Sequence, residues 1–177
     1  MKHFFKLGEM NVLPLLHAVQ RQPELWNAND LRTRFPGTPH KEASDIWLWF
    51  NAPNSADVAN DRDVVPYPAW AALPQARSLV FDLLRAVEAV QLGRVIITKL
   101  APGKKITPHV DAGAPALFYK RYQIALQSLP GALFRIADET VNFNSGEVWL
   151  IDNRAEHAVE NNSKDDRIVM IVDVRPG

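Results

Sequence analysis

Cysteine is missing from this 177-residue sequence, and neither sign of charge is in excess. Without cysteine the chain has no disulfides, no zinc–thiolate site and no thiol nucleophile. Twenty basic residues balance twenty acidic ones, and neither sign forms a long run. We therefore expect no nucleic-acid partner and no anionic-membrane partner.

Long apolar runs are missing too. No stretch approaches the roughly 18 apolar residues of a membrane span. Residues 1–6 lack the apolar core and small-residue cleavage site of a signal peptide. These absences predict a cytoplasmic protein without a membrane partner, and they leave the oligomeric state open. The length predicts one domain over residues 1–177, with a helical and mixed part at 1–92 and a β-rich part at 93–177.

Apolar spacing predicts two helices in the first part. One runs from about Val12 to Gln22, with Asn11 as its N-cap, and the other from about Pro74 to Val90. A strand-like run between them carries Trp47 and Trp49, two residues apart. That spacing predicts that both side chains share a face, which usually belongs to the core.

Eight short runs rich in β-branched and aromatic residues follow Gly93, with turn residues between them. They lie at about Val95–Leu100, Thr107–Asp111, Tyr119–Leu126, Leu133–Ala137, Thr140–Phe143, Glu147–Asp152, Glu156–Asn161 and Arg167–Val174. Eight closely spaced strands predict a mainly β fold, a two-sheet jelly roll. The last run is apolar at nearly every position, so we expect the barrel interior to cover one face and the N-terminal helices the other.

Two of the five histidines lie in this β-rich part and suggest a metal site. His109 and Asp111 are two apart on the second run, so both side chains point to one face. His157 lies in the seventh run, and the second and seventh strands of a jelly roll are neighbours. Two histidines and one carboxylate form the facial triad of non-haem iron(II) oxygenases. Zinc accepts the same ligands, so the residue types leave the metal open.

Arg167 begins the eighth run, ten residues after His157. If these two strands form a hairpin with both side chains inward, Arg167 lies roughly 7–13 Å along the strand from His157, at about 3.3 Å per residue. A 2-oxo acid chelating the metal would present its far carboxylate at about that distance, and a guanidinium binds carboxylates with two parallel hydrogen bonds.

From Leu100 to Asp173 the sequence resembles the aspartyl/asparaginyl β-hydroxylase family of cupin-like 2-oxoglutarate oxygenases. The segments that carry the resemblance are LAPGKKITPHVD, RYQIAL, GEVWLIDN and HAVEN, followed by DRI. The resemblance implies a double-stranded β-helix, iron(II) at His109, Asp111 and His157, O2 as the oxidant, and the 2-oxoglutarate 5-carboxylate on Arg167. It further implies that Arg121 helps to hold cosubstrate or substrate.

Two departures from the family pattern stand out. Animal members lack the acidic ligand, whereas Asp111 is present here, as in the similar bacterial free-proline hydroxylases. Gln123 stands where the family often has histidine, and it keeps a hydrogen-bonding group without charge beside the expected cosubstrate. The resemblance implies a substrate that is a small molecule or peptide, hydroxylated at an sp³ carbon of a small amino acid or an amino-acid side chain.

Two other functions remain open on the residues alone. A cupin-like zinc hydrolase or isomerase would use the same triad without Arg167, and a jelly-roll binding module would use neither. Two further residues are expected to have no functional role: Trp149 is predicted to lie in the core, and His40 to be an ordinary loop histidine.

Overall fold

The computed structural model describes all residues 1–177, and its main feature is a pair of antiparallel sheets that face each other. The larger sheet has the order β1-β9-β6-β11-β4-β2-β3, and the smaller has the order β5-β10-β7-β8. Their strands are β1 Phe4–Glu9, β2 Ser44–Phe50, β3 Val65–Pro66, β4 Ala89–Leu100, β5 Lys105–His109, β6 Lys120–Gln127, β7 Ala132–Ile136, β8 Glu139–Val141, β9 Glu147–Ile151, β10 His157–Asn161 and β11 Arg167–Pro176. The predicted mainly β jelly roll is confirmed, including all eight strands after Gly93.

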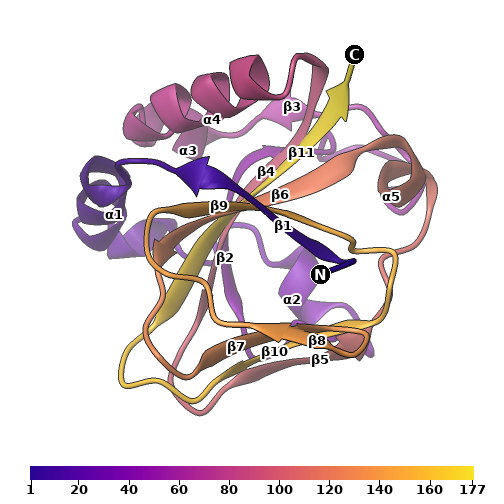
Figure 1. Cartoon of the computed structure of the whole chain (residues 1–177). Coiled ribbons are helices and arrows are strands. Elements are labelled where there is room, and N and C mark those ends of the chain that lie inside the picture. The colour runs from indigo at the N-terminus through magenta and orange to yellow at the C-terminus, as the bar shows by residue number, and fades with distance from the viewer.

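Short helices join and cover these strands. They are α1 Leu13–Gln20, the 3₁₀ turn η1 Pro23–Leu25, α2 Leu31–Arg34, α3 Pro68–Ala72, α4 Gln75–Ala86 and α5 Ala114–Phe118. Figure 1 shows α1, α3 and α4 on the face of the larger sheet that is turned away from the smaller sheet. None of these helices is long and apolar enough to cross a bilayer.

Two apolar clusters hold the layers together, and β11 contributes to both. Met170 and Val172 pack under the helices with Leu79 and Leu83 of α4. Ile171, with its neighbours along the strand, packs between the sheets in the second cluster. Alternation along one strand therefore buries both faces, as the continuous apolar run predicted. The packing of the two sheets fixes the positions of the side chains that point between them, and the candidate site is built from these side chains.

Both helix predictions were right in kind and wrong at the ends. Val12, and not Asn11, occupies the N-cap of α1, where no side chain makes a capping hydrogen bond. Helix α4 ends at Ala86 because Glu88 has a φ of 50°, a left-handed conformation that the helix cannot continue through. Val90 is therefore part of β4.

Two strand predictions were wrong, each through an irregularity that apolar patterning does not reveal, and the hairpin considered for the seventh and eighth runs does not form. A register shift between Trp47 and Trp49 puts Trp47 between the sheets and Trp49 against the helix-side cluster, so they do not share a face. Strand β5 ends at His109, which leaves Asp111 in the following loop. Strands β10 and β11 lie in different sheets and form no hairpin.

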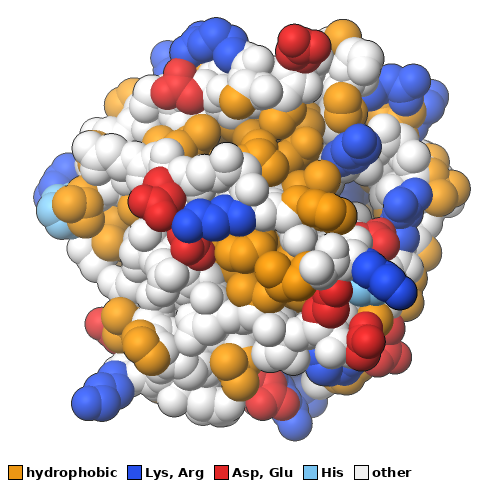
Figure 2. Space-filling model, in the orientation of Figure 1, with side chains coloured by type: hydrophobic (Ala, Val, Ile, Leu, Met, Phe, Trp, Pro, Cys, Tyr) orange, Lys and Arg blue, Asp and Glu red, His pale blue; other side chains and the backbone are white.

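Charged side chains of both signs are scattered over the face drawn in Figure 2, among apolar side chains. This face shows no field of one sign, in keeping with the net charge of zero.

Candidate metal centre and cosubstrate pocket

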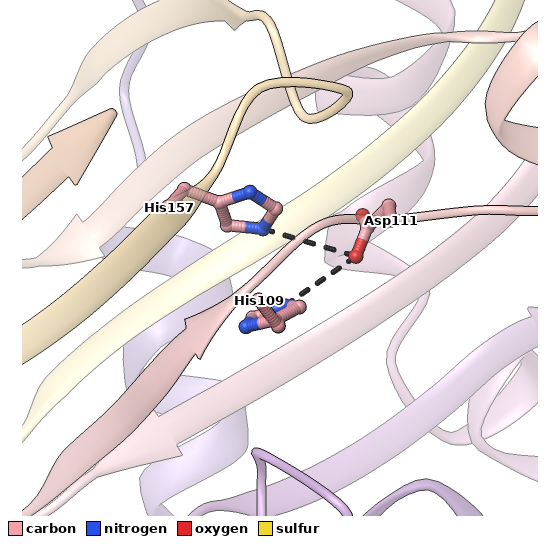
Figure 3. A group of neighbouring side chains, drawn as sticks. All are labelled: His109, Asp111 and His157. Carbon is pink, nitrogen blue, oxygen red and sulfur yellow. Dashed lines mark ion pairs between the residues drawn. The ribbon is translucent and has the colours of Figure 1, made fainter. Parts of the chain in front are cut away.

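Three side chains converge where β5 and β10 lie side by side. His109 and His157 are direct partners across the two strands, which brings their rings to 4.2 Å between centroids. Asp111 returns from the loop after β5, with its Oδ1 3.4 Å from His109 Nε2 and 3.8 Å from His157 Nε2. The three ligand atoms all lie within 4.8 Å of one another (Figure 3). Two ligand atoms about 2.0–2.2 Å from one ion lie at most about 4.4 Å apart, so the triad is close to the spacing that one ion requires.

The backbone sets which nitrogen of each histidine is free. Nδ1 of His109 lies 2.8 Å from the Thr107 carbonyl oxygen, and Nδ1 of His157 lies 2.9 Å from that of Ala155. Each Nδ1 must donate its proton to the carbonyl, so each Nε2 keeps a lone pair. Nε2 of His109 is buried and has no hydrogen-bond partner in the protein. A buried lone pair without a partner is what a metal ligand leaves when no metal is bound.

Asp111 is held by two neighbours that leave one oxygen for an ion. Its Oδ2 accepts hydrogen bonds from Arg121 Nη1 at 2.6 Å and from Asn153 Nδ2 at 2.9 Å. Burial opposes its ionisation, but Arg121 and then His109 outweigh burial and hold the pKa of the Asp111 carboxyl well below its usual value. Burial lowers the pKa of His157. An ionised carboxylate beside neutral imidazoles is the protonation state that a divalent cation needs.

Arg121 extends this support to β11. Its Nε and Nη2 donate to both oxygens of Asp173 at 2.8 Å, while Nη1 holds Asp111. Burial lowers the pKa of Arg121, but the two carboxylates outweigh burial and raise it. The structure therefore engages Arg121 with two carboxylates instead of leaving its guanidinium free for cosubstrate, although Arg121 lines both cavities described next.

Two cavities meet at the triad. The inner one, about 30 Å³, runs between the sheets past His157 and Gln123 to Arg167. The outer one, about 270 Å³, opens at the mouth of the barrel and is lined by Arg32, Arg94, Asp111 and Asp173, among others. His40 and His109 line both cavities.

Arg167 lies at the inner end, on the opposite sheet from the histidines, and its side chain is 2% exposed. It reaches the cavity across the barrel instead of along a hairpin. Its Nη2 donates to Gln123 Oε1 at 3.2 Å, and the rings of Phe134 and Phe143 lie within 6 Å of the guanidinium carbon. Burial lowers the pKa of Arg167 to about 10, and no carboxylate balances its charge.

Sequence reasoning missed Asn153, which follows β9 and holds the Asp111 carboxylate. Its position two residues beyond a buried strand was visible in the sequence, but nothing there linked it to Asp111. His40 proved less ordinary than expected, because its ring packs edge-on against His109 at 4.9 Å. Burial, and then Arg32, lower the pKa of His40. Trp149 is buried in the inter-sheet core, as expected.

Comparison with known proteins identifies this arrangement. The sequence profile of the aspartyl/asparaginyl beta-hydroxylase family matches residues 57–176, more than half of the chain. The chain belongs to this family. It is accordingly a 2-oxoglutarate-dependent dioxygenase with iron(II) and 2-oxoglutarate as cofactors, and the hydrolase and binding-module alternatives fall away. The match spans the triad, Arg121, Gln123 and Arg167.

Solved structures share the fold with this family member at low sequence identity. A prolyl hydroxylase from Trichoplax adhaerens, in complex with a hypoxia inducible factor peptide fragment, gives a TM-score of 0.61 at 12% identity, over 98% of this chain and 84% of that one. A prolyl-4-hydroxylase from Pseudomonas putida gives 0.56 at 14% identity, over 99% and 94%.

An oxidoreductase of the 2OG-Fe(II) oxygenase family from Burkholderia pseudomallei gives a TM-score of 0.54 at 15% identity, over 75% of this chain. The chain spans 66% of that protein's length. Among curated proteins, no sequence matches the chain.

Proposed function

We propose that this protein hydroxylates an sp³ carbon of a small amino acid or an amino-acid side chain, with iron(II) held by His109, Asp111 and His157. The convergence of these three ligand atoms on one point, at the junction of two cavities, is the observation that carries the proposal. The same three residues offer two imidazoles and one carboxylate, the ligand set of non-haem iron(II) oxygenases.

The inner cavity suits an anionic cosubstrate because the positive charge of Arg167 lies at its inner end. Arg167 is a buried cation without a carboxylate partner, so a carboxylate arriving there gains a strong ion pair and relieves the unbalanced charge. We assign Arg167 to the far carboxylate of 2-oxoglutarate. Because the cavity is only about 30 Å³, side chains that line it, Gln123 among them, must move to admit the cosubstrate.

When bound, iron(II) with 2-oxoglutarate supplies O2 activation, in which the cosubstrate loses CO2 and becomes succinate. The residues of the chain position the metal ligands and exclude water. Arg121 and Asn153 fix the orientation of the Asp111 carboxylate. Apolar side chains of the inner cavity, such as Ile171 and Phe134, keep water from its walls.

A direct test is anaerobic addition of iron(II) and 2-oxoglutarate to the purified protein. We expect a visible absorption band that needs both additions, and succinate once O2 is admitted. The variant Asp111→Ala should lose the band, and Arg154→Ala, a surface change outside both cavities, should keep it. An unchanged band and unchanged succinate yield in Asp111→Ala would rule out this metal site.

A further inference from the structure

A third hollow lies on the surface beside α5, away from the two cavities of the triad. Its volume is about 490 Å³, larger than that of either cavity. In Figure 1, α5 stands at the end of the larger sheet that lies away from α1. We call this hollow the α5 groove, and its lining includes Lys2, Phe5, Leu117, Lys120, Leu150 and Arg175.

The floor of the groove is apolar because the helices cover only part of the outer sheet face. Phe5, Leu150 and Tyr122 are cross-strand partners, so they form one row on that face. Tyr122 is buried in the helix-side cluster, whereas Leu150 is half-buried and Phe5 is 50% exposed. Leu117 of α5, which is 77% exposed, lines the groove as well. Apolar side chains of β1, β9 and α5 therefore line one hollow that no other part of the chain fills.

The rim of the groove carries an excess of positive charge. The cations that line it are Lys2, Lys120, Arg154 and Arg175. Asp152 is the one side-chain carboxylate in the lining, and Arg154 Nε lies 3.3 Å from its Oδ1. The other three cations have no carboxylate within ion-pair distance. With the terminal carboxylate of Gly177 counted, four positive charges face two negative ones. On the α5 side of the face in Figure 2, Lys and Arg side chains stand around apolar ones.

The groove adjoins the outer cavity without containing any metal donor. Ala116, Tyr119 and Asn153 line both spaces, and α5 lies between them. None of the three triad residues lines the groove. A molecule in the α5 groove therefore leaves the metal ligands in place.

We propose that the α5 groove docks an acidic segment of a partner protein, in which a large apolar side chain is flanked by aspartate or glutamate. The apolar side chain packs between Phe5 and Leu117, and the carboxylates pair with the three cations that lack a partner. An apolar centre inside a charged rim is the usual anatomy of a protein interface, and the unlike charges steer the encounter. A bilayer surface could meet the cationic rim but would leave the hollow unfilled, so the shape favours a chain segment.

The test selects random phage-displayed peptides on the full chain and then titrates the selected sequences as labelled synthetic peptides. We expect these sequences to be rich in aspartate and glutamate next to a large apolar residue, and their affinity to fall as salt is added. Lys120→Gln combined with Arg175→Gln should lower the affinity about 2- to 30-fold, because one exposed ion pair contributes a factor of about 1.4 to 5. Leu117→Ser should lower it about 10-fold through the loss of apolar burial.

Arg21→Gln combined with Lys164→Gln is the matched control, since it removes the same charge at exposed positions outside the groove and should leave the affinity unchanged. Amide versions of the selected peptides, with asparagine and glutamine in place of the acids, should bind the wild type more weakly and discriminate little between it and the groove variant. Vesicles of phosphatidylserine test the bilayer alternative. Selection of no peptide, selected sequences without acidic residues, equal losses in the two double variants, or binding of vesicles in place of peptides would overturn the inference.

Discussion

Replacement of Arg167 by methionine should change stability and cosubstrate binding in opposite directions. Lowering the pKa of a guanidinium from 12.5 to about 10 corresponds to roughly 3 kcal/mol against the charged form. Methionine removes this cost and fills a similar volume, while it gives up one hydrogen bond to Gln123 and two ring contacts. We therefore expect Arg167→Met to be as stable as the wild type, or more stable, when no cosubstrate is present.

With cosubstrate the order should reverse. At a 2-oxoglutarate concentration of about 100 times its dissociation constant, the wild type gains about 2.7 kcal/mol of stability. Loss of charge-assisted hydrogen bonds worth roughly 1.5–3 kcal/mol lowers affinity about 10- to 150-fold. At a 100-fold loss, the same concentration stabilises the variant by only about 0.4 kcal/mol.

Chemical denaturation under anaerobic conditions with iron(II), with and without 2-oxoglutarate, measures both effects. Arg135→Met is the control, since Arg135 lies on the small sheet at the surface, paired with Glu156, and should respond to 2-oxoglutarate like the wild type. Equal stabilisation of Arg167→Met and the wild type by 2-oxoglutarate would refute the assignment of the anchor.

Three further outcomes are expected. Asp111→Ala should weaken iron(II) binding at least about 100-fold by metal titration, and an unchanged affinity would remove Asp111 from the ligand set. Asn153→Ala, which keeps all three ligands, should weaken iron(II) binding about 10- to 100-fold. The control Asn162→Ala, at an exposed position, should bind iron(II) like the wild type. Equal affinities of the two variants would show that Asn153 does not support the metal site. Burial raises the pKa of Glu147, but the hydrogen bonds from Lys6, Asn144 and Trp149 together outweigh burial and lower this pKa to about 2. The stabilisation from the ionised carboxylate is therefore full above about pH 4.5 and is lost as the pH falls toward 2. Glu147→Gln should flatten the stability profile in that window, and an unaltered acid slope would contradict this.

The β-rich part was predictable because each strand shows its pattern locally. Residues 167–174 carry β-branched and apolar residues without interruption, and the structure buries both faces of that strand. Strand β1 was missed because it is short and interrupted by Gly8, and its partner β9 lies about 140 residues away. The expectation of one domain stays a prediction.

The candidate site was predictable as a set of residue types and not as a geometry. The three triad residues do converge, but Asp111 reaches the others from a loop and not from the strand that its spacing suggested. Arg167 faces the histidines from the opposite sheet, a relation that depends on strand order. The role of Asn153 depends on a contact with Asp111, more than 30 residues away, which no local pattern encodes.

Strand β11 carries both Asp173, which supports the metal carboxylate through Arg121, and Arg167, the proposed anchor. The two residues are six positions apart, an even number, so both side chains project from the same face. Deleting or inserting one residue between them would turn one of the two out of the barrel while the other stayed inside. The length of this segment, about 20 Å, therefore sets the distance between the two groups. Deleting or inserting a single residue there should abolish activity, whereas most exchanges of one apolar residue for another should be tolerated.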